Sequence, residues 1–147
     1  MLEIVQRIIK RKNEIIEVAS CYEEYCNSIG NEIYKYDYIL GNFVGYESIL
    51  KEQEVYDFFS AFTEEELEVI LCVMYYGRDC YEGRINSGVS SLGEIIKLYR
   101  DNYFLGYSIE DNINQIIEKG LAIGKYFKEG FKVKNIYMPL IMETFSV

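Results

Sequence analysis

Histidine and tryptophan are absent from this chain, and proline occurs only once, at Pro139. Without histidine, the chain has no imidazole to serve as a general base or a metal ligand, so Ser-His-Asp and Cys-His catalysis are excluded. Chemistry based on carboxylates, tyrosine, lysine or Mg²⁺ is not excluded. Because proline breaks helices, its near absence permits long ones.

Motifs that bind phosphates or carry redox chemistry are also missing. Gly83 and Gly88 fit neither a G-x-x-x-x-G-K-[ST] nor a G-x-G-x-x-G pattern, so they do not form a phosphate-binding loop of either kind. The chain contains no Cys-x-x-Cys motif, which excludes a thioredoxin-like redox centre. We therefore expect no catalytic residue and no cofactor.

The cysteines are expected to be free thiols. Cys21 and Cys26 lie five residues apart, so on one continuous helix they point about 140° away from each other and cannot both bind one zinc ion. A chain of this length and apolar content needs neither a disulfide nor a structural metal to fold. We expect no metal site and buried thiols at all four positions, Cys21, Cys26, Cys72 and Cys80.

The composition is that of a globular protein outside the membrane. Half of the residues are hydrophobic and 27% are charged, a balance typical of folded domains. No apolar run approaches the roughly 20 residues that span a bilayer. The first residues, MLEIVQRIIKRKNEI, mix charges throughout and lack the apolar core of a signal peptide. We expect one helical domain over residues 1–147, located in the cytoplasm and without membrane contact.

Apolar residues at helical spacing predict a first helix from about Leu2 to Ser28, and Gly30 is expected to end it. Residues 33–46 are rich in aromatic side chains and alternate in places, which favours irregular structure or a short helix, with a short strand or hairpin as the alternative. Residues 46–62 are expected to form one helix or two short ones. The apolar face of the first helix consists of Val5, Ile8, Ile9, Ile15, Ile16, Ala19, Tyr22 and Cys26.

A capping box marks the start of the next helix. Thr63 is followed three residues later by Glu66, so the hydroxyl and the carboxylate can each accept a hydrogen bond from an unpaired backbone N–H. Gly77 is expected to end this helix. Residues 80–91, which contain two glycines and three serines, are expected to form a loop, and apolar spacing predicts another helix over 91–103.

The last predicted helix begins at Ser108 and ends near Gly130. Gly120 and Gly124 lie inside it, and their four-residue spacing puts both on one face, where we expect close packing within the domain. The approach of a ligand or partner is the alternative. Residues 132–147 are expected to be extended or β-like. The fold class is therefore all-α, a bundle of five or six helices around one core, with at most a minor β element.

Acidic residues are concentrated in the middle of the chain. The net charge is −9, and between residues 47 and 68 only Lys51 offsets the carboxylates. Such a charge disfavours direct binding to nucleic acid and favours basic partners through long-range steering. A solvated face that only keeps the chain soluble is the alternative. The carboxylates that we expect to contact a protein partner are Glu47, Glu52, Glu54, Asp57, Glu64 and Glu65.

A second candidate site lies just after Gly77 and contains Arg78, Asp79, Glu82 and Arg84. The planar guanidinium groups could hold a phosphate or a carboxylate, and the carboxylates could hold a divalent ion. The alternative is structural, with an Arg–Asp pair that ties the loop to the end of the helix.

Two segments of the C-terminal half resemble a small bacterial family of helical domains of unknown function. They are LCVMYYGRD at residues 71–79 and YFKEGF at residues 126–131. That family pairs a helix ending in Gly-Arg-Gly-Asp with a final helix ending in a sequence like Tyr-Leu-Glu-Glu-Gly-Leu, and this chain lacks the second glycine of the first motif. The resemblance implies a helical fold and no particular function. In size, acidity and lack of catalytic residues, the chain is also similar to small immunity or inhibitor proteins of bacterial conflict systems.

These observations favour a non-enzymatic binding protein that neutralises or regulates a protein partner, which we expect to be basic. The first alternative is an enzyme or small-ligand binder that uses Arg78, Asp79, Glu82 and Arg84 and would need a deep pocket at that loop. The second is a structural subunit of a homo-oligomer, in which the 15 tyrosines supply the chain's own interface.

Overall fold

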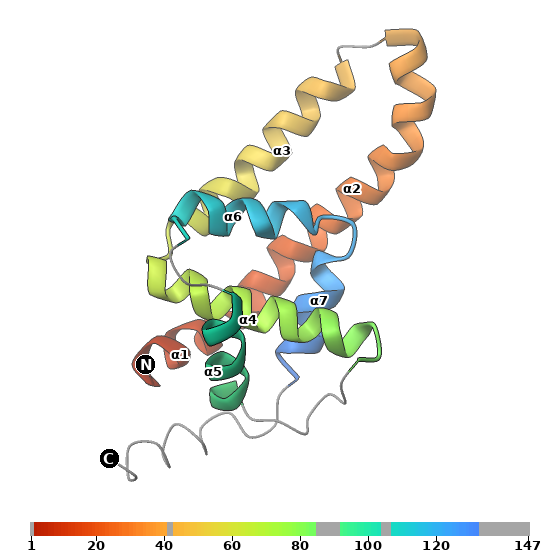
Figure 1. Ribbon diagram of the computed structural model, residues 1–147. Coiled ribbons are helices and arrows are strands. Elements are labelled where there is room, and N and C mark those ends of the chain that lie inside the picture. The colour runs from red at the N-terminus through yellow and green to blue at the C-terminus, as the bar shows by residue number, and fades with distance from the viewer. Residues whose placement is uncertain (1, 41–42, 85–91, 104–106, 133–147) are drawn as a thin grey trace, which may run out of the picture.

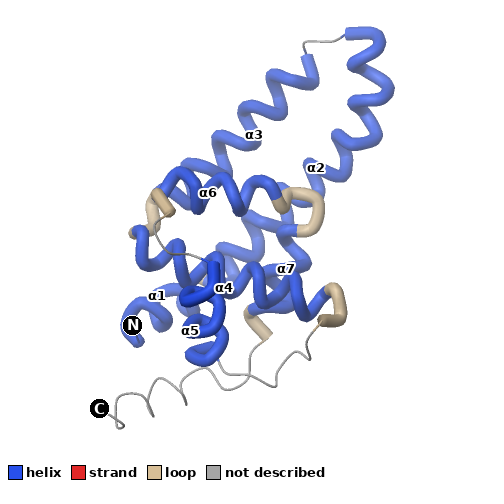
Figure 2. The backbone as a smooth tube through the Cα atoms, in the orientation of Figure 1, coloured by secondary structure: helices blue, strands red, loops and turns tan. Residues whose placement is uncertain are grey.

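The computed structural model describes residues 2–40, 43–84, 92–103 and 107–132, with side chains for 3–28, 51–84, 93–100 and 107–132. Within these ranges the chain forms seven helices and no strand (Figure 1, Figure 2). The predicted all-α class is confirmed, with slightly more helices than the five or six expected. The segment 132–147, expected to be extended or β-like, lies outside the described residues except for Lys132, which is in a turn. The helices are α1 (Leu2–Lys10), α2 (Lys12–Leu40), α3 (Phe43–Ser60), α4 (Glu64–Tyr81), α5 (Leu92–Tyr103), α6 (Ile109–Glu118) and α7 (Ile123–Gly130).

Helix α4 is the central element, because it is buried on almost every side. A helix that is apolar all round has to be covered by other helices. Helices α1, α5, α6 and α7 each pack against it, and they surround it in Figure 1. Helix α2 packs on α7 and α3, and α3 also packs on α6. The buried residues of α4 are Leu67, Val69, Ile70, Leu71, Cys72, Val73, Met74, Tyr76 and Gly77.

Helix α4 begins with the predicted capping box. The hydroxyl of Thr63 accepts a hydrogen bond from the Glu66 N–H at 3.1 Å, and the Thr63 N–H donates to Glu66 Oε1 at 2.9 Å. The predicted cap at Ser108 is confirmed as well, because its hydroxyl accepts from the Asp111 N–H at 3.1 Å. Each cap satisfies backbone donors that have no partner inside the helix.

The prediction that Gly77 ends α4 is wrong, because this glycine serves a helix contact and not a turn. A Cβ atom at Gly77 would lie 1.7 Å from the carbonyl oxygen of Tyr126 and 2.8 Å from the backbone nitrogen of Gly130. A Cβ atom at Gly130 would lie 2.2 Å from the carbonyl oxygen of Val73. Helices α4 and α7 therefore touch backbone to backbone, at a distance that only glycine allows.

The glycine that follows the end of α4 is Gly83. Helix α4 continues to Tyr81, and Glu82 forms its C-terminal cap. Gly83 has a φ of 77°, a left-handed conformation that costs other residues roughly 1–2 kcal/mol. The predicted loop at 80–91 therefore starts two residues later than expected, and residues 85–91 lie outside the described part of the chain.

The predicted N-terminal helix is divided into α1 and α2 by a turn at Arg11. The Arg11 N–H donates to the carbonyl of Ile8 at 3.0 Å, and the Ile15 N–H donates to the carbonyl of Arg11 at 2.9 Å. The break lets α1 pack on α4 while α2 packs on α7 and α3. The predicted apolar face is confirmed across the break, with Val5, Ile8, Ile15 and Ala19 fully buried and Tyr22 nearly so.

Helix α2 does not end at Gly30, as predicted, but runs on to Leu40. Residues 33–40, expected to be irregular or a short helix with a strand as the alternative, are part of this long helix, and the next helix already begins at Phe43. A single glycine costs a helix interior only about 1 kcal/mol, which a helix of this length tolerates. Figure 1 shows the far ends of α2 and α3 extending together beyond the other helices.

The predicted helix from Ser108 to Gly130 is divided into α6 and α7 by a turn at residues 119–122. Both internal glycines nevertheless make the close contacts that we expected. A Cβ atom at Gly120 would lie 2.7 Å from Cys26 Sγ, and one at Gly124 would lie 2.8 Å from the Cα of Ser20. The glycines allow the turn and α7 to lie directly against α2.

The side chain of Asn112 is buried and has no hydrogen-bond partner among the described residues. Asn112, in the first turns of α6, is 1% exposed, and neither its amide nitrogen nor its amide oxygen has a partner among the described residues. An unsatisfied buried polar group costs about 1–3 kcal/mol. This asparagine therefore weakens the core around α6.

We expect Gly77→Ala to destabilise the fold. The added methyl group meets the backbone of α7, at a cost near the upper end of the roughly 1–3 kcal/mol typical of overpacking. That cost exceeds the gain in helix propensity, which is at most about 1 kcal/mol. Urea denaturation measures the difference. Asn114→Ala, at an exposed position of α6, is the control and should change stability by no more than about 0.5 kcal/mol. A Gly77→Ala variant as stable as the parent would contradict the backbone contact.

We expect Asn112→Leu to stabilise the protein by about 1 kcal/mol, because a leucine of similar size removes two unsatisfied polar atoms. Asn112→Asp should destabilise it instead, because a carboxylate would be buried without a cation. Thermal and urea denaturation of both variants check this. A loss of stability in Asn112→Leu would show that the amide has a partner in solution.

Candidate functional site

The carboxylates predicted to bind a partner lie on α3 and at the start of α4. Glu52, Glu54 and Asp57 on α3, and Glu64 and Glu65 in the first turn of α4, are all exposed. Successive residues of a helix are 100° apart, so Glu54 and Asp57 share one side of α3 while Glu52 points away from Glu54. The acidic run is therefore not a single patch. Glu47 belongs to α3, and its side chain lies outside the described part of the chain.

Only some of these carboxylates are available to a partner. Glu54 pairs with Lys51 at 3.4 Å, and Asp57 accepts a hydrogen bond from the Gln53 amide at 2.8 Å. The side chains of the other three described carboxylates form no ion pair or hydrogen bond with the described residues. These are Glu52, Glu64 and Glu65.

Two further carboxylates of the same acidic run serve the fold. Burial acts to raise the pKa of Glu66, but the hydrogen bonds from Thr63 and the contact with Arg7 at 3.3 Å outweigh it and hold the pKa below its usual value. The stability that Glu66 supplies is therefore present above the usual carboxyl pKa and is lost as the pH falls. Burial raises the pKa of Glu68, although this carboxylate contacts Arg100 at 3.1 Å.

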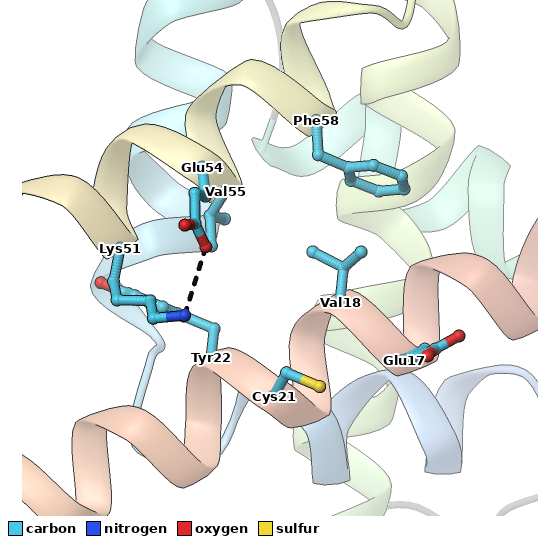
Figure 3. A pocket seen from close by; sticks show the side chains of 8 residues that line it. All are labelled: Glu17, Val18, Cys21, Tyr22, Lys51, Glu54, Val55 and Phe58. Carbon is cyan, nitrogen blue, oxygen red and sulfur yellow. Dashed lines mark hydrogen bonds and ion pairs between the residues drawn. The ribbon is translucent and has the colours of Figure 1, made fainter.

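A groove with a volume of about 250 Å³ lies between α2 and α3 (Figure 3). Its floor is apolar, because Tyr22 and Val55 are buried there. Its rim is polar and exposed, with Glu17 and Cys21 on α2 and Lys51 and Glu54 on α3. The lining residues are Glu17, Val18, Cys21, Tyr22, Lys51, Glu54, Val55 and Phe58.

The spacing of the lining residues explains why they share one groove. On each helix they recur at intervals of three or four residues, and such positions lie on the same face.

Two cations lie over aromatic rings beside the groove. The guanidinium carbon of Arg11 lies 4.4 Å from the ring centre of Phe62 and 5.5 Å from that of Phe58. Lys51 Nζ lies 5.9 Å from the ring centre of Tyr25.

Sequence reasoning singled out Glu54 but missed the groove to which it belongs. Glu17 and Cys21 were not candidates, and Val18 and Phe58 were assigned no role in binding. The missing information was which helix packs on α2, since the groove exists only where α2 and α3 lie together. The alternation of exposed and apolar positions at 17, 18, 21 and 22 is consistent with the rim of a groove, but any helix at the surface shows the same pattern.

The second candidate site, at Arg78, Asp79, Glu82 and Arg84, does bring its four residues together. Arg78 donates twice to Asp79 Oδ1, at 3.1 Å from both Nε and Nη2. Arg84 lies 3.6 Å from Asp79 and 3.0 Å from Glu82. The hydroxyl of Tyr99 on α5 donates to the other oxygen of Asp79. The charges are matched within the cluster, which favours the structural interpretation, a tie between the end of α4 and α5.

The cysteines differ in exposure. Cys72 is fully buried, and burial raises its pKa to about 12. Cys26 and Cys80 are half-buried, and burial raises the pKa of both. Cys21 is exposed at the groove, so the expectation of a buried thiol is wrong at this position. No group of three or more acidic or cysteine side chains in the described part of the chain is arranged to hold a metal ion.

None of the helices in the described ranges combines the length and the apolar character needed to cross a membrane. Comparisons of the chain with family models, curated proteins and solved structures found no match. The resemblance carried by residues 71–79 and 126–131 therefore stays a prediction. These two segments do contact each other, because Gly77 of the first lies against Tyr126 and Gly130 of the second.

We expect Cys21 to be the fastest-reacting thiol of the native protein. At pH 8 the raised pKa of Cys26, Cys72 and Cys80 reduces their thiolate fraction, and their burial restricts access. Titration with Ellman's reagent should show one fast thiol, which disappears in Cys21→Ser, and four thiols after unfolding in urea. Two or more fast thiols, or a fast phase that survives Cys21→Ser, would contradict the arrangement around the groove.

Proposed function

We propose that this protein is a non-enzymatic binding protein, of the immunity or inhibitor type, that neutralises or regulates a protein partner with a basic surface. The observation that carries the proposal is a set of exposed carboxylates that form no ion pair with any described residue, in a chain whose net charge is −9. These are Glu52, Glu64 and Glu65. Cytoplasmic location is part of this proposal.

Unpaired charges matter more for binding than paired ones. A carboxylate already bound to a lysine loses part of its attraction for a partner's cation, whereas a free one keeps it. Exposed charges raise the association rate of an oppositely charged partner by about tenfold or more at low salt. They contribute little to the fold, at most about 1 kcal/mol each. The fold therefore depends little on these carboxylates, which leaves them available to a partner.

An enzymatic role has less support from the side-chain geometry. The cluster of Arg78, Asp79, Glu82 and Arg84 pairs its own charges, so an incoming anion would have to compete with Asp79 and Glu82. The groove between α2 and α3, at about 250 Å³, is smaller than the roughly 300–1,000 Å³ typical of small-molecule sites. Both observations favour binding to a macromolecule.

Charge reversal tests the proposal. We expect Glu52, Asp57, Glu64 and Glu65, all changed to lysine, to slow association with the partner by about tenfold or more at low salt and to flatten the salt dependence. The partner is first captured from a lysate on the parent protein at low salt, released at high salt, identified and purified. Association rates are then measured by stopped-flow fluorescence, and circular dichroism confirms that the variant is folded.

A matched control separates local docking from the total charge. Changing Glu3, Glu24, Glu110 and Glu118 to lysine alters the net charge equally at exposed positions outside the acidic run. If the two variants bind equally slowly, only total charge matters and no docking surface exists on α3 and α4. A partner that is not basic, or one that binds the α3–α4 variant as fast as the parent, would refute the proposal.

A further inference from the structure

The groove between α2 and α3 has an apolar floor between two charged lips, and this arrangement limits what can occupy it. Tyr22 and Val55 are 6% and 4% exposed, and they form a floor that is mostly apolar. The lips carry Glu17 on α2 and Glu54 on α3, which Figure 3 places at the edges of the opening. An occupant must therefore combine apolar side chains with positive charge.

The length of the groove fits two side chains of a helix. On α3 the lining residues run from Lys51 to Phe58, a distance of about 10 Å at 1.5 Å per residue. Apolar side chains at positions i and i+4 of a helix stand about 6 Å apart, so two of them fit within this length. Recognition of an amphipathic helix in a groove works through such paired anchors.

The charges along the rim determine which sign of charge the occupant must carry. Lys51 already neutralises Glu54 at 3.4 Å, and Arg11 donates to Glu14 at 2.9 Å. Glu17 has no ion pair or hydrogen bond within the described part of the chain. Of the three charged residues that line the groove, two are carboxylates and one is a lysine, so the lining is negative overall.

We propose that the groove between α2 and α3 binds a cationic amphipathic helix of the partner, which inserts two apolar side chains between the lips and places a lysine or arginine against Glu17. This inference rests on the proposed function and adds a second contact with the basic partner, in the groove, to the exposed carboxylates of α3 and α4. A free carboxylate at one lip and an apolar floor together match a segment in which basic and apolar residues alternate at helical spacing.

A synthetic helical peptide tests this inference without knowledge of the natural partner. The probe is a peptide of about 18 residues, long enough to be helical, with leucines on one face and lysines on the other. The comparison peptide has glutamate in place of lysine. We expect the lysine peptide to bind, as measured by fluorescence anisotropy, and to slow the reaction of Cys21 with Ellman's reagent by about tenfold, because the thiol at the lip becomes covered. The glutamate peptide should do neither.

Variants at the lips separate a bound groove from general attraction. Cys21→Trp fills the opening from an exposed position and should weaken binding of the lysine peptide by about tenfold, whereas Cys21→Ser should bind like the parent. Glu17→Lys should weaken binding about fivefold, whereas Glu110→Lys on α6 should have little effect. Should Cys21→Trp fold poorly, reaction of the folded parent with N-ethylmaleimide blocks the same opening.

Each result decides between the groove and its alternatives. If the lysine peptide binds but Cys21 reacts at its original rate and Cys21→Trp binds normally, the groove inference is wrong, while docking on α3 and α4 is unaffected. If no lysine peptide binds, the inference is also wrong, and the charge-reversal experiment judges the proposed function separately. A Cys21 that reacts as slowly as Cys72 in the free protein shows that the chain itself covers the groove. If protection of Cys21 from Ellman's reagent increases with protein concentration, a second copy of the chain covers the groove.

Discussion

The fold depends on the contact between the backbones of α4 and α7. Gly77 and Gly130 let the two helices approach until the carbonyl oxygens of Tyr126 and Val73 face glycine Cα atoms. This approach brings Phe127 to the fully buried position where its ring stacks on Phe59, with the ring centres 6.3 Å apart. Helix α7 in turn supports α2, and α2 supports α3. The positions of α2 and α3, and the groove between them, therefore follow from this contact.

Features with local causes could be predicted from the sequence, and features with tertiary causes could not. The caps at Thr63 and Ser108 depend on residues three positions apart, and both were predicted correctly. Gly77 was misread because a glycine that ends a helix and one that admits a neighbouring backbone are identical in sequence. The sequence around Arg11 contains no glycine or proline that would predict a turn there. It follows from the different packing partners of α1 and α2.

The same division applies to the candidate sites. The exposure of Glu52, Glu64 and Glu65 could be expected from their acidity. The ion pairs of Glu66 with Arg7 and of Glu68 with Arg100 could not be predicted, because each joins distant segments of the chain. The groove was missed because its lips come from two helices whose pairing is not visible in either. Charge can thus be located from sequence, but whether a charge is free depends on the fold.

The central position of α4 also affects how the protein is made. Its apolar surface is complete once residue 81 has been synthesised, but α7, which covers it, is complete only at residue 130. At a synthesis rate of about 5–20 residues per second, roughly 3 to 10 seconds pass between the completion of α4 and the completion of α7. During that time an apolar helix is open to aggregation or to chaperones. The shortest time for which this surface can stay uncovered is therefore set by the rate of synthesis.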